Sequence, residues 1–137
     1  MECIDTNILI SFIDKNDTKH SMAEHLLNKY KNKIISELNI IEIRSVLFRN
    51  NLEEEKIGAL IDYLLIKGEI QIKNIDINMS IMKGNEIVNN VKLKTLDLLH
   101  ISNAILMNAD RFVTFDKDLI KKKNSINDYK VEIIDAL

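Results

Sequence analysis

Residues 2–10 of the chain read ECIDTNILI. A short apolar run is followed at once by three polar residues, Asp5, Thr6 and Asn7, and then by a second apolar run. This order is typical of a buried strand that ends in a polar turn and continues into a helix. Asp, Thr and Asn all cap helices well, so capping explains any one of these residues. It explains less well why all three stand together at the end of a strand.

The same alternation continues along the chain. Apolar runs predict strands at residues 2–5, 33–36, 69–75, 111–115 and 130–134, and longer periodic stretches predict helices at 7–15, 21–31, 37–50, 53–67, 77–91, 96–108 and 118–123. Strands that alternate with helices favour a parallel sheet covered on both faces. We therefore predict an α/β fold, a three-layer α/β/α sandwich with a short, mainly parallel sheet, formed by one domain over residues 1–137.

Composition restricts the function classes. The net charge is −2, so the chain lacks the overall basic character that simple nucleic-acid binders often show. No stretch reaches 18 apolar residues and no basic region precedes an apolar run at the N-terminus, so we expect neither a membrane span nor a signal peptide. The single cysteine, Cys3, cannot form a disulfide within the chain, which fits a reducing cytoplasm. We expect a cytoplasmic protein.

Three aspartates stand at the ends of predicted strands or the start of a predicted helix. Asp5 and Asp116 each follow a strand, and Asp97 lies in the first turn of a helix that Thr95 is expected to cap. Ligands bind parallel α/β folds beyond the carboxyl ends of the strands. Each aspartate also has a structural explanation, because Asp5 and Asp116 can cap helices and Asp97 can interact with the helix dipole. Their joint placement is what favours a site.

Glu42 is harder to explain structurally. Residues 38–47 read LNIIEIRSVL, which is apolar nearly all round and predicts a largely buried helix. The residues three or four positions from Glu42 include no cation; they are Leu38, Asn39, Ser45 and Val46. A carboxylate among such neighbours is costly to bury unless it is paired or bound to a metal. We therefore favour a functional role for Glu42.

Clustered carboxylates need a counter-charge to stay ionised, and hard divalent cations supply it. Mg²⁺ and Mn²⁺ both prefer oxygen ligands. In phosphodiester hydrolysis such ions lower the pKa of a water molecule and orient the scissile phosphate. We expect Thr6, Asn7, Ser36 and Thr114 to hold the carboxylates in place, although each is also an ordinary turn or capping residue, and Asp118 could do either.

Four segments together resemble the PIN domain, and especially the VapC-type toxins of toxin–antitoxin pairs. They are Ile4-Asp5-Thr6-Asn7-Ile8-Leu9-Ile10, Ser36-Glu37-Leu38-Asn39-Ile40-Ile41-Glu42, Leu96-Asp97-Leu98-Leu99-His100 with the residues up to Ala104, and Phe112-Val113-Thr114-Phe115-Asp116-Lys117-Asp118-Leu119. Each motif is weak alone, but four in this order are fairly specific. The third motif departs from the family pattern, because Leu98 stands where Ala is common after the Asp.

The resemblance implies a Mg²⁺- or Mn²⁺-dependent endoribonuclease that forms a homodimer, cuts RNA and is inhibited by a cognate antitoxin. Asp5, Glu42, Asp97 and Asp116 would be its catalytic, metal-binding acids. Two alternatives stay open: a housekeeping RNA-processing nuclease with the same fold, and a non-catalytic RNA- or protein-binding module. A neighbouring small antitoxin gene would distinguish a toxin from an RNA-processing nuclease. A metal-binding titration would distinguish an enzyme from a non-catalytic module.

The remaining polar residues give weaker indications. Four lysines beside Asp116 could contact RNA phosphates, although a solvated loop accounts for most of them: Lys117, Lys121, Lys122 and Lys123. His100, one helical turn after Asp97, could orient that carboxylate or be a structural, partly buried histidine.

The helices predicted at 37–50 and 53–67 carry more apolar surface than a short sheet needs, so we expect partner surfaces there.

Overall fold

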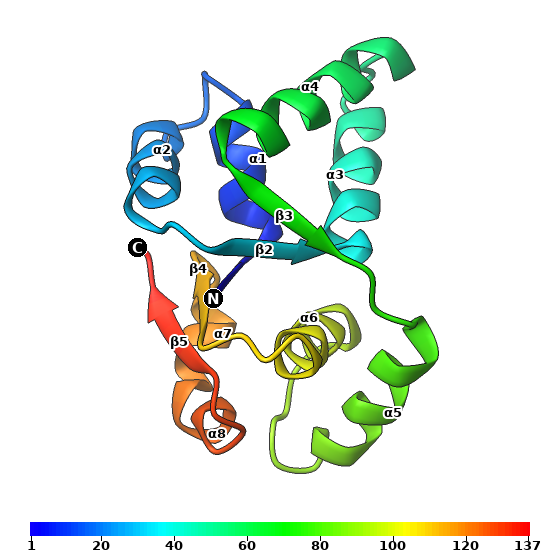
Figure 1. Cartoon of the computed structure of the whole chain (residues 1–137), viewed down its shortest axis with the longest axis vertical. Coiled ribbons are helices and arrows are strands. Elements are labelled where there is room, and N and C mark those ends of the chain that lie inside the picture. Colours follow the sequence, from blue (N-terminus) through cyan, green and yellow to red (C-terminus); the bar gives the residue numbers. More distant parts are fainter.

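A computed structural model describes all residues, 1–137. Five parallel strands form one sheet in the order β3-β2-β1-β4-β5 (Figure 1). The strands are β1 (Glu2–Ile4), β2 (Lys33–Ser36), β3 (Ile70–Lys73), β4 (Arg111–Thr114) and β5 (Glu132–Asp135). All five lie within or beside the predicted ranges, and the α/β fold with a short parallel sheet is confirmed.

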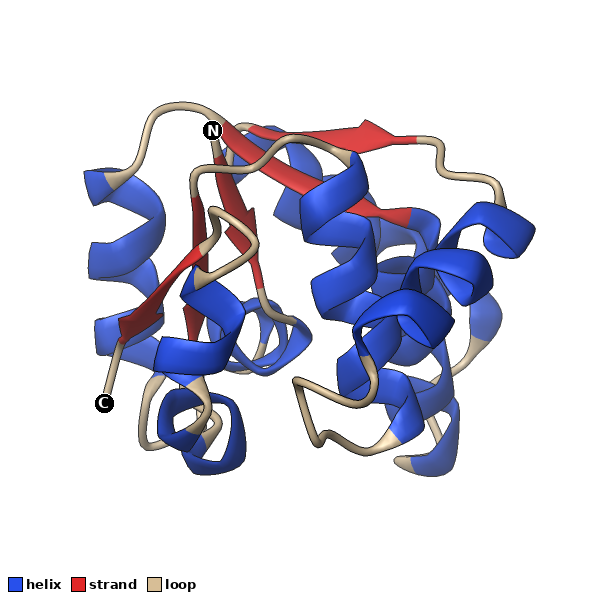
Figure 2. Cartoon of the chain, turned by 90° about the horizontal axis from the view of Figure 1, so that it is seen from below, coloured by secondary structure: helices blue, strands red, loops and turns tan.

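Eight helices connect and cover these strands. They are α1 (Thr6–Ile13), α2 (His20–Lys29), α3 (Glu37–Arg49), α4 (Glu54–Lys67), α5 (Ile77–Ile87), α6 (Thr95–Leu106), α7 (Lys117–Lys121) and α8 (Lys123–Asn127). Figures 1 and 2 show helices on both sides of the strands, as a three-layer arrangement requires. No helix is long and apolar enough to cross a membrane.

Alternation along the strands explains why there are two cores. In β1, Cys3 packs into one hydrophobic cluster and Ile4 into the other, and Ile34 and Ile35 divide in the same way in β2. Successive side chains of a strand point to opposite faces of the sheet, so an unbroken apolar run feeds both faces. The cluster that contains Ile4 is completed mainly by α1 to α4, and the cluster that contains Cys3 by α5 to α8.

The strand order places a switch point between β1 and β4. From β1 the chain proceeds to β2 and β3 on one side, and the later strands β4 and β5 lie on the other side. Ile4 of β1 is aligned with Val113 of β4, so both strands end at the same edge of the sheet. Crevices at such switch points, beyond the carboxyl ends of the strands, are where open parallel sheets bind ligands.

Three local predictions were wrong. The helix that carries Glu42 is not buried all round: Ile43 and Leu47 of α3 are buried, but Ile41 is 63% exposed. Because this helix is apolar on nearly every side, its sequence did not show which side is buried. Thr95 is the first residue of α6 and not its cap, since Lys94 stands at the cap position without a side-chain hydrogen bond. Helix α8 was not predicted, because its polar sequence, KNSIN, has a single buried residue, Ile126.

Candidate active site

Asp5 ends β1 and begins α1. It is the N-cap of the helix, and its Oδ1 accepts a hydrogen bond from the backbone N–H of Thr6 at 2.8 Å. Its Oδ2 accepts a hydrogen bond from the Thr114 hydroxyl at 2.5 Å. The side chain of Asp5 is almost fully buried, with 7% exposure. The capping interpretation is therefore correct, and the same contacts fix the carboxylate at the edge where β1 and β4 end.

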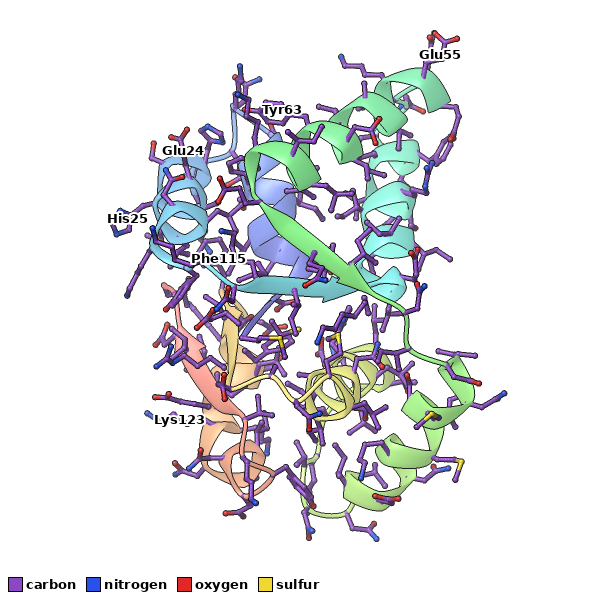
Figure 3. The ribbon with its side chains drawn as sticks, viewed as in Figure 1. Glu24, His25, Glu55, Tyr63, Phe115 and Lys123 are labelled. Atoms are coloured by element: carbon purple, nitrogen blue, oxygen red, sulfur yellow. The ribbon has the colours of Figure 1, made fainter.

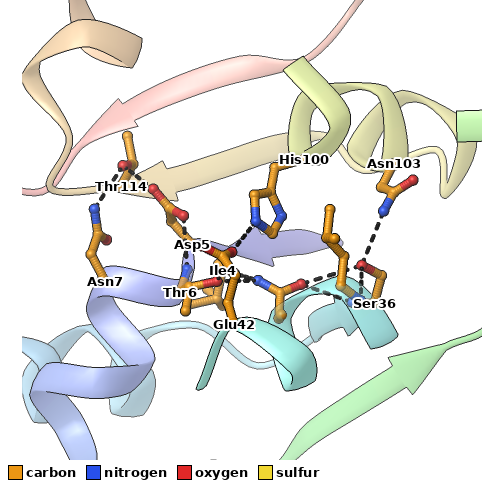
Figure 4. A network of polar contacts seen from close by, with 11 residues as sticks. Ile4, Asp5, Thr6, Asn7, Ser36, Glu42, His100, Asn103 and Thr114 are labelled. Carbon is orange, nitrogen blue, oxygen red and sulfur yellow. Dashed lines mark hydrogen bonds and ion pairs between the residues drawn. The ribbon is translucent and has the colours of Figure 1, made fainter. Parts of the chain in front are cut away.

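Glu42 reaches the same place from α3. Its Oε1 accepts hydrogen bonds from the Thr6 hydroxyl at 2.7 Å and from Nε2 of His100 on α6 (Figure 4). No hydrogen bond reaches its Oε2. Two donors on one oxygen fix the carboxylate and leave the other oxygen available to a ligand. His100 is buried, with 3% exposure, and its hydrogen bond goes to Glu42 and not to Asp97, the carboxylate that the sequence suggested it could orient.

A buried chain of amides and hydroxyls holds Thr6. The Asn39 side chain donates to the Thr6 hydroxyl at 3.0 Å and to the backbone oxygen of Ile4 at 3.3 Å. The Oδ1 of Asn39 accepts a hydrogen bond from the backbone N–H of Ser36 and completes a capping box at the start of α3. Asn103 of α6 in turn donates to the Ser36 hydroxyl at 3.1 Å. Ser36 thus acts through Asn39 and touches no carboxylate itself.

Asn39 and Asn103 were assigned no role from the sequence. A capping-box spacing was present for Asn39, since it stands three residues after Ser36. For Asn103, whose contact joins residues 67 positions apart, no local pattern could have served.

Thr114 organises the fourth acidic segment. Besides donating to Asp5, its hydroxyl oxygen accepts hydrogen bonds from the backbone N–H of Asp116 at 2.9 Å and from the Asn7 side chain at 3.5 Å. Asp116 caps α7, and its Oδ1 accepts a hydrogen bond from the backbone N–H of Asp118 at 2.8 Å. Thr114 is fully buried, whereas Asp116 is half-buried and no hydrogen bond reaches its Oδ2.

Asp97 lies in the first turn of α6 and is half-buried. No hydrogen bond reaches its carboxylate. Burial raises its pKa, and the negative charge of Asp116 raises it further, as do those of Glu42 and Asp118, while the charge of His100 opposes them. Asp97 therefore lies within the electrostatic field of the other acids, although it arrives from a different helix.

The two best-held carboxylates have opposite pKa shifts. Burial raises the pKa of Asp5 to about 6, against hydrogen bonds from Thr114 and Thr6. Burial also acts to raise the pKa of Glu42, but the hydrogen bond and charge of His100, together with the Thr6 hydroxyl, outweigh it and the pKa lies below its usual value. Its neighbours thus keep Glu42 ionised. The ionised forms of Asp5 and Asp97 are disfavoured, because the protein supplies too little positive charge to offset their burial.

The chemistry of the donor set fits a hard divalent cation. The acids contribute only oxygen ligands, and no hydrogen bond reaches either oxygen of Asp97, the Oε2 of Glu42 or the Oδ2 of Asp116. A cation among them would relieve the repulsion that raises the pKa of Asp97. As the side chains stand, no three His, Cys, Asp or Glu residues converge closely enough to form a ready metal cluster. Mg²⁺ does not need such a cluster, because it usually keeps several waters and binds only one or two carboxylates directly.

The basic residues are distributed differently from the acids. Lys117, Lys121 and Lys123 are exposed on α7 and α8, and Lys122 between these helices is half-buried. Arg44 pairs with Glu54 of α4 at 2.7 Å on the surface. None of these side chains bonds to the candidate site. Lys123 lies on the outside of the molecule (Figure 3).

The fold is similar to that of several solved structures of low sequence identity. The chain superposes on VapBC2 from Rickettsia felis, solved bound to a promoter DNA fragment, with a TM-score of 0.68 and 22% identity over 98% of both chains. It superposes on VapC20 of Mycobacterium tuberculosis, a sarcin–ricin loop cleaving toxin, with a TM-score of 0.70 and 13% identity, covering 88% of this chain and 94% of that one. A toxin–antitoxin complex from Klebsiella pneumoniae gives 0.69 and 19%, covering 100% and 98%.

The sequence itself supplies the assignment. No curated protein matches it. The family model described as PIN domain matches residues 3–124, which include all four acidic segments and run from β1 to the start of α8. The chain belongs to the PIN domain family.

Proposed function

We propose that this protein is a Mg²⁺- or Mn²⁺-dependent endoribonuclease and the toxin of a VapBC-type toxin–antitoxin pair. The observation that carries the proposal is a chain of hydrogen bonds that joins three acidic segments: Thr6 donates to Asp5 and to Glu42, and the Thr114 hydroxyl links Asp5 to the backbone of Asp116. Asp97 of α6 is the fourth acid, and the charges of Asp116 and Glu42 raise its pKa. Membership of the PIN domain family and the similarity to VapC20 and VapBC folds support it.

In this account Asp5, Glu42, Asp97 and Asp116 hold the cation. The bound ion would lower the pKa of a water molecule and neutralise charge on the scissile phosphate. The protein's part is positioning: Thr114 and the Thr6 backbone fix Asp5, and Thr6 and His100 fix Glu42 through its Oε1. The Oε2 of Glu42 and the Asp97 carboxylate, which accept no hydrogen bond from the protein, would bind the ion or its waters.

Partner surfaces are proposed from exposed apolar side chains. The predicted surfaces on α3 and α4 contain Phe48 and Ile66, which are 48% and 72% exposed. Helix α5, which was not predicted to carry such a surface, exposes four more: Ile77, Met79, Ile81 and Met82. We propose that a second copy of the chain and a cognate antitoxin use these faces, as toxin and antitoxin associate in the structures named above. We also propose that the protein acts in the cytoplasm.

The test is a cleavage assay on structured and single-stranded RNA with Mg²⁺, Mn²⁺ or EDTA. We expect cleavage that requires the metal and falls at least about 100-fold in Asp97→Asn. Asp62→Asn is the matched control, because Asp62 is an exposed helical aspartate on α4, away from the site. Cleavage that survives in Asp97→Asn would place the activity elsewhere or in a contaminant. A folded protein that neither cleaves RNA nor binds Mn²⁺ would favour the non-catalytic module.

A further inference from the structure

A cavity of about 450 Å³ lies beside the acidic residues, and the site described above does not use it. Its walls come from α1, from the segment before α2 and from the residue after β4: Asn7, Ile10, Ser11, Asp17, Thr18, Lys19 and Phe115. Five of the seven residues are polar or charged. The volume lies within the range of small-ligand sites. Because most of the lining is polar, a polar ligand of nucleotide size would suit the cavity better than an apolar one.

Two of the lining residues connect the cavity to the acids. Asn7 donates to the Thr114 hydroxyl, and that hydroxyl donates to Asp5. Phe115 directly precedes Asp116, and its backbone N–H donates to Asn7 Oδ1 at 3.4 Å. One wall of the cavity is thus built from side chains that border the carboxylates.

Lys19 supplies the cavity with a positioned positive charge. Its ammonium lies over the ring of Phe115, 5.0 Å from the ring centre, and no carboxylate lies within salt-bridge distance of it. The one acid in the cavity, Asp17, accepts a hydrogen bond from the backbone N–H of Lys19 at 2.7 Å and thereby helps to fix the loop. Phe115 is 5% exposed, so the ring acts as a support for the ammonium rather than as an open stacking surface.

A phosphodiester chain bound at the acids needs such a charge. The four carboxylates repel phosphates, and the overall charge of the protein is −2, so attraction must come from local cations. The lysines of α7 and α8 are solvent-facing and line none of this cavity, whereas Lys19 lines it together with Asn7 and Phe115. The hydroxyls of Ser11 and Thr18 and the carboxylate of Asp17 are groups that can bind a ribose 2′-hydroxyl.

We propose that this cavity is a substrate subsite that binds the nucleotide adjoining the scissile phosphate of single-stranded RNA, with Lys19 on its phosphate. The proposal rests on the ribonuclease function proposed above. Lys19 is a binding residue in this account and takes no part in the chemical step.

Binding of a labelled single-stranded RNA to full-length Asp97→Asn protein in Mg²⁺ tests the subsite without cleavage. Lys19→Gln in this background should weaken binding roughly three- to tenfold at low salt and reduce the slope of log affinity against log salt by about 0.7 to 1. Lys19→Arg should retain both values. Lys29→Gln is the matched control, because Lys29 is also placed over an aromatic ring, 5.2 Å from the centre of Tyr30, but lines no part of the cavity.

The outcomes separate this proposal from the one on which it rests. If wild-type protein cleaves RNA and Lys19→Gln binds it like Lys29→Gln, with equal melting temperatures, the subsite is overturned and the nuclease function stands. If wild-type protein does not cleave RNA at all, the nuclease function fails first. Binding of RNA and of DNA of the same sequence should differ, because Ser11, Asp17 and Thr18 offer oxygen groups that can bind a 2′-hydroxyl; equal binding would remove that part of the proposal.

Discussion

Nε2 of His100 donates a hydrogen bond to Oε1 of Glu42, and this contact joins helices that are 58 residues apart in the sequence. The imidazole is buried, and the Thr6 hydroxyl of α1 donates a hydrogen bond to the same oxygen. The contact helps to keep Glu42 ionised, and no protein donor reaches its Oε2. His100 is therefore a positioning residue for the carboxylate.

Replacing His100 tests that role. His100→Leu fills a similar volume without a donor, and we expect single-turnover RNA cleavage to fall about 10- to 100-fold while RNA affinity changes little. His100→Gln places an amide N–H near the position of Nε2 and should recover part of the rate. Cleavage by His100→Leu at the wild-type rate would show that the histidine only fills space.

The hydroxyl of Thr114 should matter for stability as well. Thr114→Val keeps the shape but leaves the buried Oδ2 of Asp5 and the backbone N–H of Asp116 without their partner. We expect the free energy of unfolding to fall by about 1–3 kcal/mol in a urea titration. Thr95→Val is the control, because Thr95 is exposed and makes no side-chain hydrogen bond; an equal effect of the two changes would contradict the account.

The raised pKa of Asp5 makes the metal-free protein less stable as pH rises. Between the ordinary value of 3.8 and about 6, the folded state holds a proton on Asp5 that the unfolded state has released. Stability therefore falls through this window as pH increases, by about 2–3 kcal/mol from this group. Urea titrations in EDTA from pH 4 to pH 7 should show the fall, and Asp5→Asn should reduce it. A profile that Asp5→Asn leaves unchanged would show that Asp5 is not the group responsible.

Cys3 should be inert in the folded protein. Its thiol is 2% exposed, and burial together with the charge of Asp5 raises its pKa far above the usual value. A thiol-specific colour reagent should therefore react with no cysteine until denaturant is added, and then with one per chain. Rapid reaction of the native protein would mean that β1 opens easily.

The sequence predicted the strands well because buried parallel strands are recorded as short apolar runs, such as Cys3-Ile4 and Ile34-Ile35. It also placed Asp5, Asp97 and Asp116 at strand ends and helix starts, because such positions have local patterns. It could not assign Asn103 to Ser36 or His100 to Glu42, since these contacts depend on how α6 packs against α3. Nor could it show that Lys19, far from any acidic motif, lines a cavity beside them.

The central claim is that Asp5, Glu42, Asp97 and Asp116 form one cation site. Titration calorimetry with Mn²⁺ on the wild-type protein and on Asp5→Asn, Glu42→Gln, Asp97→Asn and Asp116→Asn tests it directly, with Asp62→Asn as control. The account predicts binding to the wild-type protein and to the control, weakened roughly 10- to 100-fold or lost in each of the other four. Affinity for Mn²⁺ that is unchanged in those four variants, or no binding to a folded wild-type protein, would contradict it.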